Sequence, residues 1–358
     1  MDWYQIHTTN TILTPTLAFY QNRIKNNIQK MLDIAGSVER LRPHIKTVKC
    51  SEITHMLINA GITKFKCATL NEARMLAKSK APDVLIAYPL IGNKQKALLQ
   101  LAALFPETNF SVLIDNQEQI NTWKEQSHHN LGFFLDIDVG MGRTGIPVSQ
   151  INDILDLIDE SSLKFKGYHL YDGHIHNTDL QERKNAVAAA FKNVIKVLDD
   201  RNDGLERICG GSITFPIHAF FEYRTLSPGT TLLWDWGYHS KFPDLNFDIA
   251  ATIISTVVSH IGTTKICIDL GHKAVASEMP AQRVYFPQLP SATITMHSEE
   301  HMVLEAGTNN QLPIGTLLYG IPWHICPTVA LHEQAQVIKN GDIIDTWQID
   351  ARNRIYSI

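Results

Sequence analysis

The sequence predicts an α/β protein, a (β/α)8 TIM-type barrel followed by a C-terminal β domain. Two observations support this fold class. From about residue 40 to residue 235, short apolar runs alternate with amphipathic segments, and after about residue 245 strand-like runs follow one another with only turns between them. We expect a strand over 1–20 that packs with the β domain, a barrel over 21–245 and the β domain over 246–358.

Eight apolar runs in the first half have the length and the flanking turn residues of parallel strands. They are 41–47, 64–68, 84–88, 109–114, 132–138, 165–170, 207–211 and 225–229. The helical patterns between them are 51–60, 70–79, 94–104, 117–126, 148–159 and 180–198. Thr69, Asn93 and Thr178 stand where helix-capping residues are expected. Eight strands that alternate with helices close a barrel.

The second half reads as strands alone. The predicted strands are 249–258, 265–270, 292–297, 302–305, 317–320, 336–339 and 343–349. Asn340-Gly341-Asp342 is typical of a hairpin turn. An early strand over 14–20 precedes a helix over 22–35, and we expect this strand to pair outside the barrel.

Composition and charge exclude several classes of protein. The net charge is −4 and no block of Lys and Arg stands out, which argues against a nucleic-acid-binding protein. No apolar run is long enough to cross a bilayer, and the segment 1–5 lacks the features of a secretion signal. The five cysteines are scattered, so a disulfide framework is not expected. We expect a cytoplasmic protein that binds neither nucleic acid nor membrane.

One lysine stands where a barrel active site is expected. Lys46 ends the first predicted barrel strand and follows Arg42-Pro43-His44, a polar and rigid run that a plain strand does not need. Barrel active sites lie at the carboxyl ends of the strands. A lysine there can form a Schiff base with a carbonyl cofactor; the alternative is an ordinary solvated lysine.

Two glycine-containing turns end later strands. Gly210-Gly211-Ser212 and Pro228-Gly229-Thr230 combine small residues with hydroxyl groups. Such turns let backbone N–H groups approach phosphate oxygens, while Ser212 and Thr230 add hydroxyl donors. Either segment alone is also compatible with a simple tight turn.

Two more strand-end segments carry polar side chains suited to chemistry. Arg143 lies in a glycine-rich loop, where it can bind a phenolate or a carboxylate, or instead pair with Asp136 or Asp138. After the sixth predicted strand, Tyr171-Asp172-Gly173-His174-Ile175-His176 places two histidines at the same rim. An imidazole there can stack on a cofactor ring or transfer protons near neutral pH.

A metal site is predicted at Trp323-His324-Ile325-Cys326-Pro327. In an extended segment, residues two apart project to the same side. Imidazole nitrogen and thiolate sulfur suit Zn²⁺, and two protein ligands leave positions open for water or substrate. A metal bound by His324 and Cys326 would therefore serve catalysis rather than folding.

Taken together, these motifs resemble a known family. The chain resembles the D-threonine aldolase and D-serine dehydratase group, the metal-activated branch of the alanine-racemase-like pyridoxal phosphate enzymes. The segments that carry the resemblance are Thr14-Pro15, 42–49, 138–145, 171–174, 210–212, 227–230 and the His324/Cys326 pair. It implies an N-terminal barrel, a C-terminal β domain and a homodimer with active sites near the subunit interface.

The resemblance also implies residue roles. Lys46, rather than Lys49, would be the Schiff-base lysine, and His174 or His176 the acid/base; sequence alone does not choose between the two histidines. His324 and Cys326 would bind a divalent metal, Zn, Mn or Mg. The residues expected to bind pyridoxal 5′-phosphate are Lys46, Arg143, Tyr171, Gly210, Gly211, Ser212, Gly229 and Thr230.

The reaction implied is lyase chemistry on a small D-3-hydroxy amino acid, with retro-aldol cleavage to glycine and an aldehyde favoured. A dehydratase acting on D-serine or D-3-hydroxyaspartate is the alternative, and a racemase or a non-catalytic pyridoxal phosphate-binding protein are more distant ones. Three positions depart from the aldolase pattern. Val48 stands where histidine is usual, Thr231 where tyrosine is frequent, and Cys326 where aldolases often have aspartate.

Overall fold

The computed structural model describes residues 2–7, 12–126, 130–279, 282–308 and 312–354. The chain divides into two compact units. The barrel unit comprises Met31–Lys46, Ile53–Gly229 and Asn353–Ile358, and the β unit comprises Met1–Lys30, Thr47–Glu52 and Thr230–Arg352. The limits predicted for the domains, near residues 20 and 245, stay predictions.

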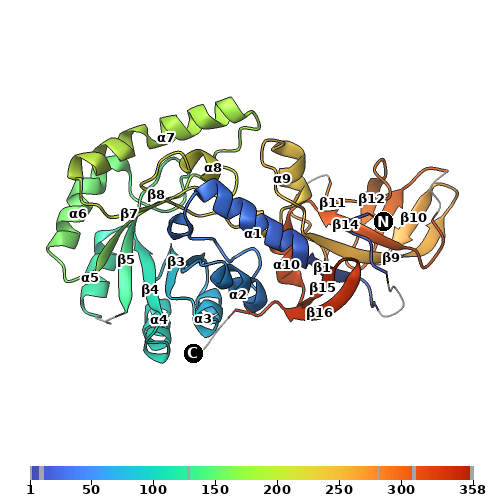
Figure 1. Cartoon of the computed structure of the whole chain (residues 1–358), viewed down its shortest axis with the longest axis horizontal. Coiled ribbons are helices and arrows are strands. Elements are labelled where there is room, and N and C mark those ends of the chain that lie inside the picture. The colour runs from blue at the N-terminus through green and yellow to red at the C-terminus, as the bar shows by residue number, and fades with distance from the viewer. Residues whose placement is uncertain (1, 8–11, 127–129, 280–281, 309–311, 355–358) are drawn as a thin grey trace. The chain divides into compact units, whose positions relative to one another are not determined.

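The barrel unit is built on one parallel sheet of seven strands, in the order in which they follow along the chain. They are β2 Lys64–Cys67, β3 Asp83–Pro89, β4 Asn109–Ile114, β5 Leu131–Asp136, β6 Phe165–Leu170, β7 Glu206–Cys209 and β8 Arg224–Leu226. The helices are α3 Leu70–Lys78, α4 Asn93–Leu104, α5 Gln117–Lys124, α6 Ile151–Asp159, α7 Leu180–Arg201 and the short α8 Phe215–His218. Helices α4 to α7 lie outside the strands (Figure 1). The alternation read from the sequence is confirmed.

The segment predicted as the first barrel strand, 41–47, is not a continuous strand. It carries two isolated bridges, Leu41 to Leu226 and His44 to Lys66. The N–H groups of Arg42 and His44 donate to β8 and the residues that follow it, whereas that of Ile45 donates to β2. Pro43 has no N–H to extend a ladder. The segment 41–46 nevertheless links the two edges of the sheet, in the place of an eighth strand.

The predicted helix caps are partly wrong. Thr69 caps α3 as expected, because its side chain accepts a hydrogen bond from the N–H of Glu72. Helix α4 begins at Asn93 itself, with Gly92 before it. Helix α7 is capped by Asp179 rather than Thr178, since the Asp179 carboxylate accepts from the N–H of Glu182.

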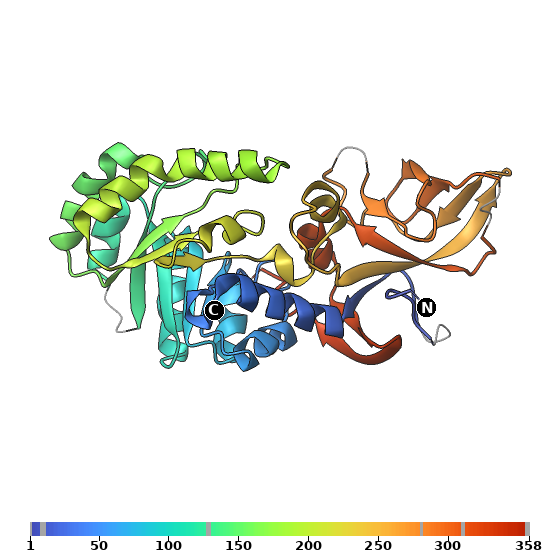
Figure 2. The same ribbon diagram turned by 45° about the horizontal axis from the view of Figure 1, so that its top comes forward.

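The β unit contains a nine-stranded sheet. Its strands are β1 Thr16–Tyr20, β9 Ala251–Ile261, β10 Lys265–Ile268, β11 Val284–Tyr285, β12 Thr293–His297, β13 Met302–Glu305, β14 Leu317–Pro322, β15 Gln334–Lys339 and β16 Asp342–Gln348. As predicted, the early strand β1 pairs outside the barrel, between β9 and β15. Asn340 and Gly341 have φ values of 54° and 86° and form the predicted hairpin turn between β15 and β16. Short helices α9 Trp236–Lys241 and α10 Ile325–Leu331 belong to this unit. The remaining α-helices among the described residues are α1 Gln21–Ala35 and α2 Ser51–Asn59, which are drawn in blue in Figure 2.

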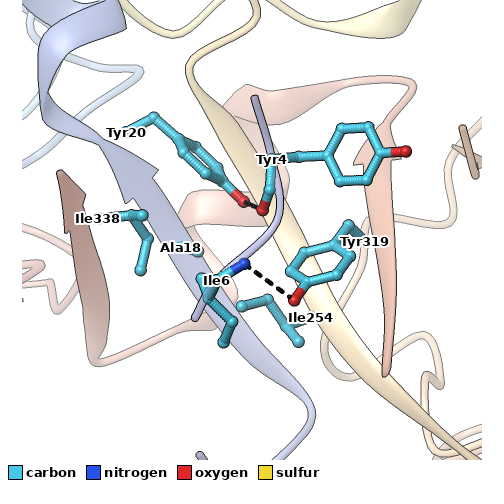
Figure 3. Close-up of a cluster of buried hydrophobic side chains, with 7 residues drawn as sticks. All are labelled: Tyr4, Ile6, Ala18, Tyr20, Ile254, Tyr319 and Ile338. Atoms are coloured by element: carbon cyan, nitrogen blue, oxygen red, sulfur yellow. Dashed lines mark hydrogen bonds between the residues drawn. The ribbon is translucent and has the colours of Figure 1, made fainter. Parts of the chain in front are cut away.

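A cluster of tyrosines and aliphatic side chains forms part of the β-unit core (Figure 3). The hydroxyl of Tyr20 donates to the carbonyl oxygen of Tyr4 at 2.7 Å, and the N–H of Ile6 donates to the hydroxyl of Tyr319 at 3.3 Å. These bonds satisfy polar atoms that would otherwise be buried at a cost. They fasten the segment 4–6 to the sheet.

No helix among the described residues is long and apolar enough to span a membrane.

Candidate functional site

Three cationic side chains of the barrel unit gather around the ring of Tyr171, which follows β6. The Nζ atoms of Lys46 and Lys66 lie 5.9 and 5.6 Å from the ring centroid, and Cζ of Arg143 lies 5.2 Å from it. A cation at this range is attracted to the electron-rich face of an aromatic ring. We call Lys46, Lys66, Arg143 and Tyr171 the Tyr171 cluster. It brings together Lys46, Arg143 and Tyr171, three residues singled out from the sequence.

The Arg143 loop is shaped by Asp138 and by glycine. The Asp138 carboxylate accepts from the N–H groups of Gly140 at 2.9 Å and Gly142 at 3.1 Å. Gly145 has a φ of +99°, and a Cβ atom there would lie 2.8 Å from the nitrogen of Asp138. A side chain at Gly145 would therefore break this turn.

Arg143 does not adopt its predicted alternative pairing. Among the described residues it forms no ion pair with Asp136 or Asp138. Asp136 instead contacts Nδ1 of His169 at 2.7 Å and accepts from the hydroxyl of Thr144 at 2.8 Å. Burial raises the pKa of Asp136, but the His169 charge and hydrogen bond outweigh it and hold this pKa below its usual value. The carboxylate therefore stays ionised near neutral pH.

The two glycine-containing turns meet, because the N–H of Gly229 donates to the hydroxyl of Ser212 at 3.1 Å. The N–H of Gly210 donates to Leu170, and that of Gly211 to the hydroxyl of Thr214. These three glycine N–H groups thus have partners inside the protein. A phosphate bound here would rely on hydroxyls, or on N–H groups that exchange their partners.

A buried polar network that the sequence analysis missed supports the turn at Gly211. The Asp172 carboxylate accepts from the hydroxyl of Thr214 at 2.8 Å and contacts Nε2 of His218 at 2.8 Å. His218 in turn contacts Arg224 through Nδ1, at 2.7 Å. Thr214 bonds both Asp172 and the N–H of Gly211, so the network fixes this turn. The sequence could have indicated a role for Asp172, because it follows a predicted barrel strand, where functional residues are expected.

The two predicted histidines are both exposed. His174 lies against the Arg143 loop, because Nε2 of His174 would be 3.0 Å from a Cβ atom placed on Gly140. The geometry thus places the His174 ring beside Gly140, in the loop that also carries Arg143.

Sequence analysis also did not identify Lys66. Its side chain is buried, with 2% of the residue exposed. Burial, together with the nearby charge of Lys46, lowers the pKa of Lys66 to about 7, against the opposing effect of Asp136 and Asp172. An amine with such a pKa is partly neutral at physiological pH.

The predicted metal ligands lie in the β unit. His324 has extended backbone and precedes α10, whereas Cys326 lies within this helix. The extended segment assumed from the sequence is therefore wrong, yet the two side chains still interact. Sγ of Cys326 also lies 3.1 Å from the hydroxyl oxygen of Thr47 and 3.5 Å from that of Thr230.

Electrostatics favour a charged pair at these two ligands. Burial lowers the pKa of His324, but the hydrogen bond and charge of Cys326 and the contact with Glu278 raise it to about 9. Nδ1 of His324 is 2.6 Å from the Glu278 carboxylate. Burial raises the pKa of Cys326, and the hydrogen bond from His324 outweighs it, so that this pKa falls below its usual value. A thiolate is the form that binds metal, whereas His324 must lose its proton to serve as a ligand.

The start of α10, which carries both ligands, is anchored by Asp235, the residue before α9. One oxygen of its carboxylate accepts from the N–H of Tyr238 at 2.9 Å, and the other from the N–H of Ile325 at 3.1 Å. Ile325 lies between the two predicted ligands. No group of three or more histidine, cysteine, aspartate or glutamate side chains suited to a metal occurs in the described part of the chain. The donor set is thus a pair, which fits a metal that keeps open positions.

The barrel unit likewise has the groups that pyridoxal 5′-phosphate requires. Lys46 offers a half-buried amine for its carbonyl, and Arg143 a guanidinium for its phenolic oxygen. Ser212 and the glycines beside it leave room where a larger side chain would meet Tyr171, since a Cβ atom on Gly211 would lie 3.2 Å from this ring.

Comparison with known proteins agrees with this arrangement. Residues 20–235 match the family model of the alanine racemase N-terminal domain. The chain belongs to this family. Residues 250–338 match a second model, described as "Putative serine dehydratase domain". The resemblance inferred from the motifs and the predicted alanine-racemase-like fold are both confirmed.

The relatives within this family include named lyases. The chain is 26% identical to a D-threonine aldolase from Arthrobacter sp., over 95% of this chain and 92% of that protein. It is 24% identical to a 3-hydroxy-D-aspartate aldolase from Paracoccus denitrificans, over 96% of this chain and 93% of that protein. The solved structure of a D-threonine aldolase from Filomicrobium marinum superposes with a TM-score of 0.87 and 26% identity, over 95% of this chain and 96% of that one.

Proposed function

We propose that this protein is a lyase that uses pyridoxal 5′-phosphate and a divalent metal ion to cleave D-3-hydroxy amino acids, with D-threonine-like substrates giving glycine and an aldehyde. The observation that carries the proposal is the Tyr171 cluster. It brings an amine and a guanidinium to one aromatic ring at the carboxyl ends of the barrel strands. The near full-length similarity to a D-threonine aldolase supports the same reaction.

In this proposal Lys46 holds the cofactor covalently, and Arg143 binds its phenolic oxygen. Ser212 and Thr230, with Gly210, Gly211 and Gly229, form the phosphate site. When bound, pyridoxal phosphate supplies an electron sink that stabilises negative charge at the substrate α-carbon. The protein residues orient the substrate and move its protons.

His324 and Cys326 are the proposed metal ligands, and Zn, Mn or Mg are the proposed metals. A divalent ion there would lower the pKa of a bound β-hydroxyl group. Thr47, whose hydroxyl contacts Sγ of Cys326, directly follows Lys46 in the chain. We assign the acid/base role to His174, because it lies against the Arg143 loop. In the aldol cleavage, this histidine would take the proton of the β-hydroxyl.

A dehydratase acting on D-serine or D-3-hydroxyaspartate is the second candidate. It is favoured by Cys326, which stands where the aldolase type often has aspartate, and by the match of residues 250–338, which include both proposed metal ligands. A D-threo-3-hydroxyaspartate dehydratase from Delftia sp. is 21% identical over 95% of this chain and 98% of that protein. In this reaction a base would remove the α-proton, and the products would be a keto acid and ammonia.

Product analysis separates the candidates. The purified protein is incubated with D-threonine, D-serine and D-3-hydroxyaspartate, and aldehyde, keto acid and ammonia are measured. Glycine and an aldehyde support the aldolase, whereas a keto acid and ammonia support the dehydratase. Change of configuration without cleavage would indicate a racemase, and no turnover of any substrate would leave a cofactor-binding protein. Loss of activity after chelation, with recovery on adding metal, tests the metal requirement.

Covalent trapping tests the lysine. Borohydride reduction followed by peptide mass spectrometry should place the cofactor on Lys46. The Lys46→Ala variant should lose the adduct, while the neighbouring Lys49→Ala variant should keep it. An adduct on Lys49 would overturn the assignment.

We also propose that the protein is a homodimer, as the resemblance implies, and that it is cytoplasmic. Light scattering on the purified protein would give twice the chain mass for a dimer, and the chain mass itself would contradict this part of the proposal. Cell fractionation tests the compartment.

A further inference from the structure

Lys66 is an ionisable residue buried inside the barrel unit. The proposed reaction gives it no role. It lies on β2, and its Nζ atom lies 5.6 Å from the centroid of the ring that Lys46 and Arg143 also approach. Only 2% of the residue is exposed. Lysine is almost never so buried without a compensating partner. Among the described residues, Lys66 forms no ion pair with a carboxylate.

The groups that face Lys66 come from several elements of the barrel unit. Lys46 and Arg42, on the segment 41–46, oppose its positive charge. Asp136, at the end of β5, and Asp172, after β6, favour it. Arg143, His169 and Cys209 lie in the same electrostatic surroundings.

The carboxylates that face Lys66 are already engaged elsewhere. Asp136 contacts His169, and Asp172 contacts His218 and Thr214. Neither is therefore committed to Lys66 as a close ion-pair partner. The amine stands near the balance between its charged and its neutral form, and a new anion nearby would shift that balance toward the ammonium.

We propose that Lys66 is the proton acceptor that makes anion binding at the Tyr171 cluster proton-coupled: when an anionic ligand occupies this cluster, Lys66 becomes an ammonium and holds the added charge. The inference deepens the proposed function and rests on it, since it takes the anionic ligand to be pyridoxal 5′-phosphate. Lys66 acts through the charge it holds near Lys46 and Tyr171 and is thus a positioning residue. Its reaction is simple protonation, in which the amine nitrogen takes one proton from water or buffer.

The pH dependence follows from linkage. The pKa of Lys66 is about 7 before the anion binds, and the anion raises it. The ammonium then favours binding fully below about pH 7, and this contribution is lost as the pH rises through the higher value of the complex. If the anion raises this pKa by about one unit, the affinity gain at low pH is about tenfold, because the coupling is reciprocal.

The experiment measures cofactor binding rather than turnover. The cofactor is removed from the purified full-length protein, and pyridoxal 5′-phosphate is added back at a series of pH values from about 6 to about 9, which span the linkage range. Equilibrium dialysis gives the affinity. Calorimetry in buffers of different ionisation enthalpy gives the protons taken up.

Four proteins are compared. The wild type should bind the cofactor about tenfold more tightly than Lys66→Met near pH 6, and the ratio should approach one near pH 9. Lys66→Arg keeps a permanent charge, so its advantage over Lys66→Met should not vary with pH. The control is Lys64→Met, on the same strand, where Lys64 contacts Glu206; it should behave as the wild type.

Proton uptake decides the inference. The inference is supported if the wild type and Lys64→Met take up more protons than Lys66→Met and Lys66→Arg, by up to about half a proton between pH 7 and pH 8 for a pKa shift of about one unit. Equal uptake and equal pH dependence in the wild type and both Lys66 variants overturns it. If Lys66→Met does not fold, Lys66→Arg alone still tests it, since arginine does not titrate here.

Two further measurements separate this inference from the proposed function. Borohydride trapping at Lys46 without any Lys66-dependent uptake refutes the inference and leaves the proposed function standing, whereas no binding of the cofactor to the wild type refutes both. Addition of D-threonine to the cofactor-loaded protein is a second arm. If Lys66-dependent proton uptake occurs only when D-threonine is added, the anion is the substrate carboxylate. The proposal that the cofactor is the anionic ligand would then be wrong.

Discussion

The guanidinium of Arg42 donates to the Asp83 carboxylate at 2.6 Å, and the Arg42 side chain has no exposure to solvent. Arg42 also pairs with Glu206 at 3.0 Å. Asp83 and Glu206 begin β3 and β7, so these contacts lie at the amino ends of the strands. The polar run before Lys46 therefore has a structural role at Arg42, at the end of the barrel strands opposite to Lys46.

Replacing Arg42 should destabilise the protein strongly. Arg42→Met leaves two partly buried carboxylates without their main partner, and breaking such a buried pair costs about 3–5 kcal/mol. Urea unfolding measures the loss. The matched control is Arg201→Met, because Arg201 contacts Asp159 at the surface, and an exposed pair contributes about 0–1 kcal/mol. Equal losses in the two variants would contradict a special role for Arg42.

Acid should destabilise the wild type through the same two carboxylates. Burial alone raises the pKa values of Asp83 and Glu206, but the charge of Arg42 outweighs it and holds both below their usual range. A lowered pKa contributes stability above the unfolded value of about 4, and the contribution is lost as the pH falls through the folded value. The free energy of unfolding should therefore decrease with falling pH below about 4. In Arg42→Met this slope should be smaller. A slope unchanged by the substitution would show that other carboxylates dominate.

Much of the fold followed from periodicity, and its exceptions have local causes. The apolar runs located all seven strands β2–β8, because strands covered by helices bury nearly every residue. The run 41–47 was misjudged, since a proline and isolated bridges replace a continuous ladder there. Two helix caps were predicted one residue away from their positions. Asp179, next to Thr178, caps α7, and Gly92, before Asn93, is the N-cap residue of α4.

The candidate site was predictable at strand ends but not inside strands. Lys46, Arg143 and Tyr171 stand in loops or at strand ends, where polar residues attract attention. Lys66 lies within β2, in the sequence Lys-Phe-Lys-Cys, where alternation suggests a solvent-facing lysine. In a barrel, the face opposite the helices is the interior, so the same alternation places Lys66 inside. Asp235 was missed because its partner Ile325 is remote in the sequence.

The two histidines near the Arg143 loop should differ in their effect on activity. His174→Ala should lower kcat by about 10²–10⁴-fold, the usual effect of losing a general acid or base, because His174 lies against Gly140. His176→Ala is the matched control and should change kcat by no more than about threefold, since no general acid or base is lost. Steady-state kinetics on D-threonine across pH measure both. A larger loss in His176→Ala would transfer the role to that residue.

Asp235 should govern metal affinity without being a ligand. Its carboxylate holds the N–H of Ile325, between His324 and Cys326, and also the N–H of Tyr238 at the start of α9. Asp235→Ala releases both, so the two ligands lose their fixed spacing. Loss of a residue that orients metal ligands typically lowers affinity by about 10–100-fold. Competition with a chelating dye measures this affinity for added Zn²⁺.

Two further variants separate ligand positioning from general damage. Asp235→Asn keeps one acceptor oxygen, and it should lose less affinity than Asp235→Ala. Asp200→Ala removes an exposed carboxylate at the end of α7 and should bind Zn²⁺ as the wild type does. Burial raises the pKa of Asp235 to about 6, which shows that its charge is costly where it lies. Asp235→Asn removes this charge as Asp235→Ala does but keeps an acceptor oxygen, so the difference between the two variants measures the effect of the hydrogen bonds. Wild-type affinity in Asp235→Ala would show that α10 holds both ligands without this anchor.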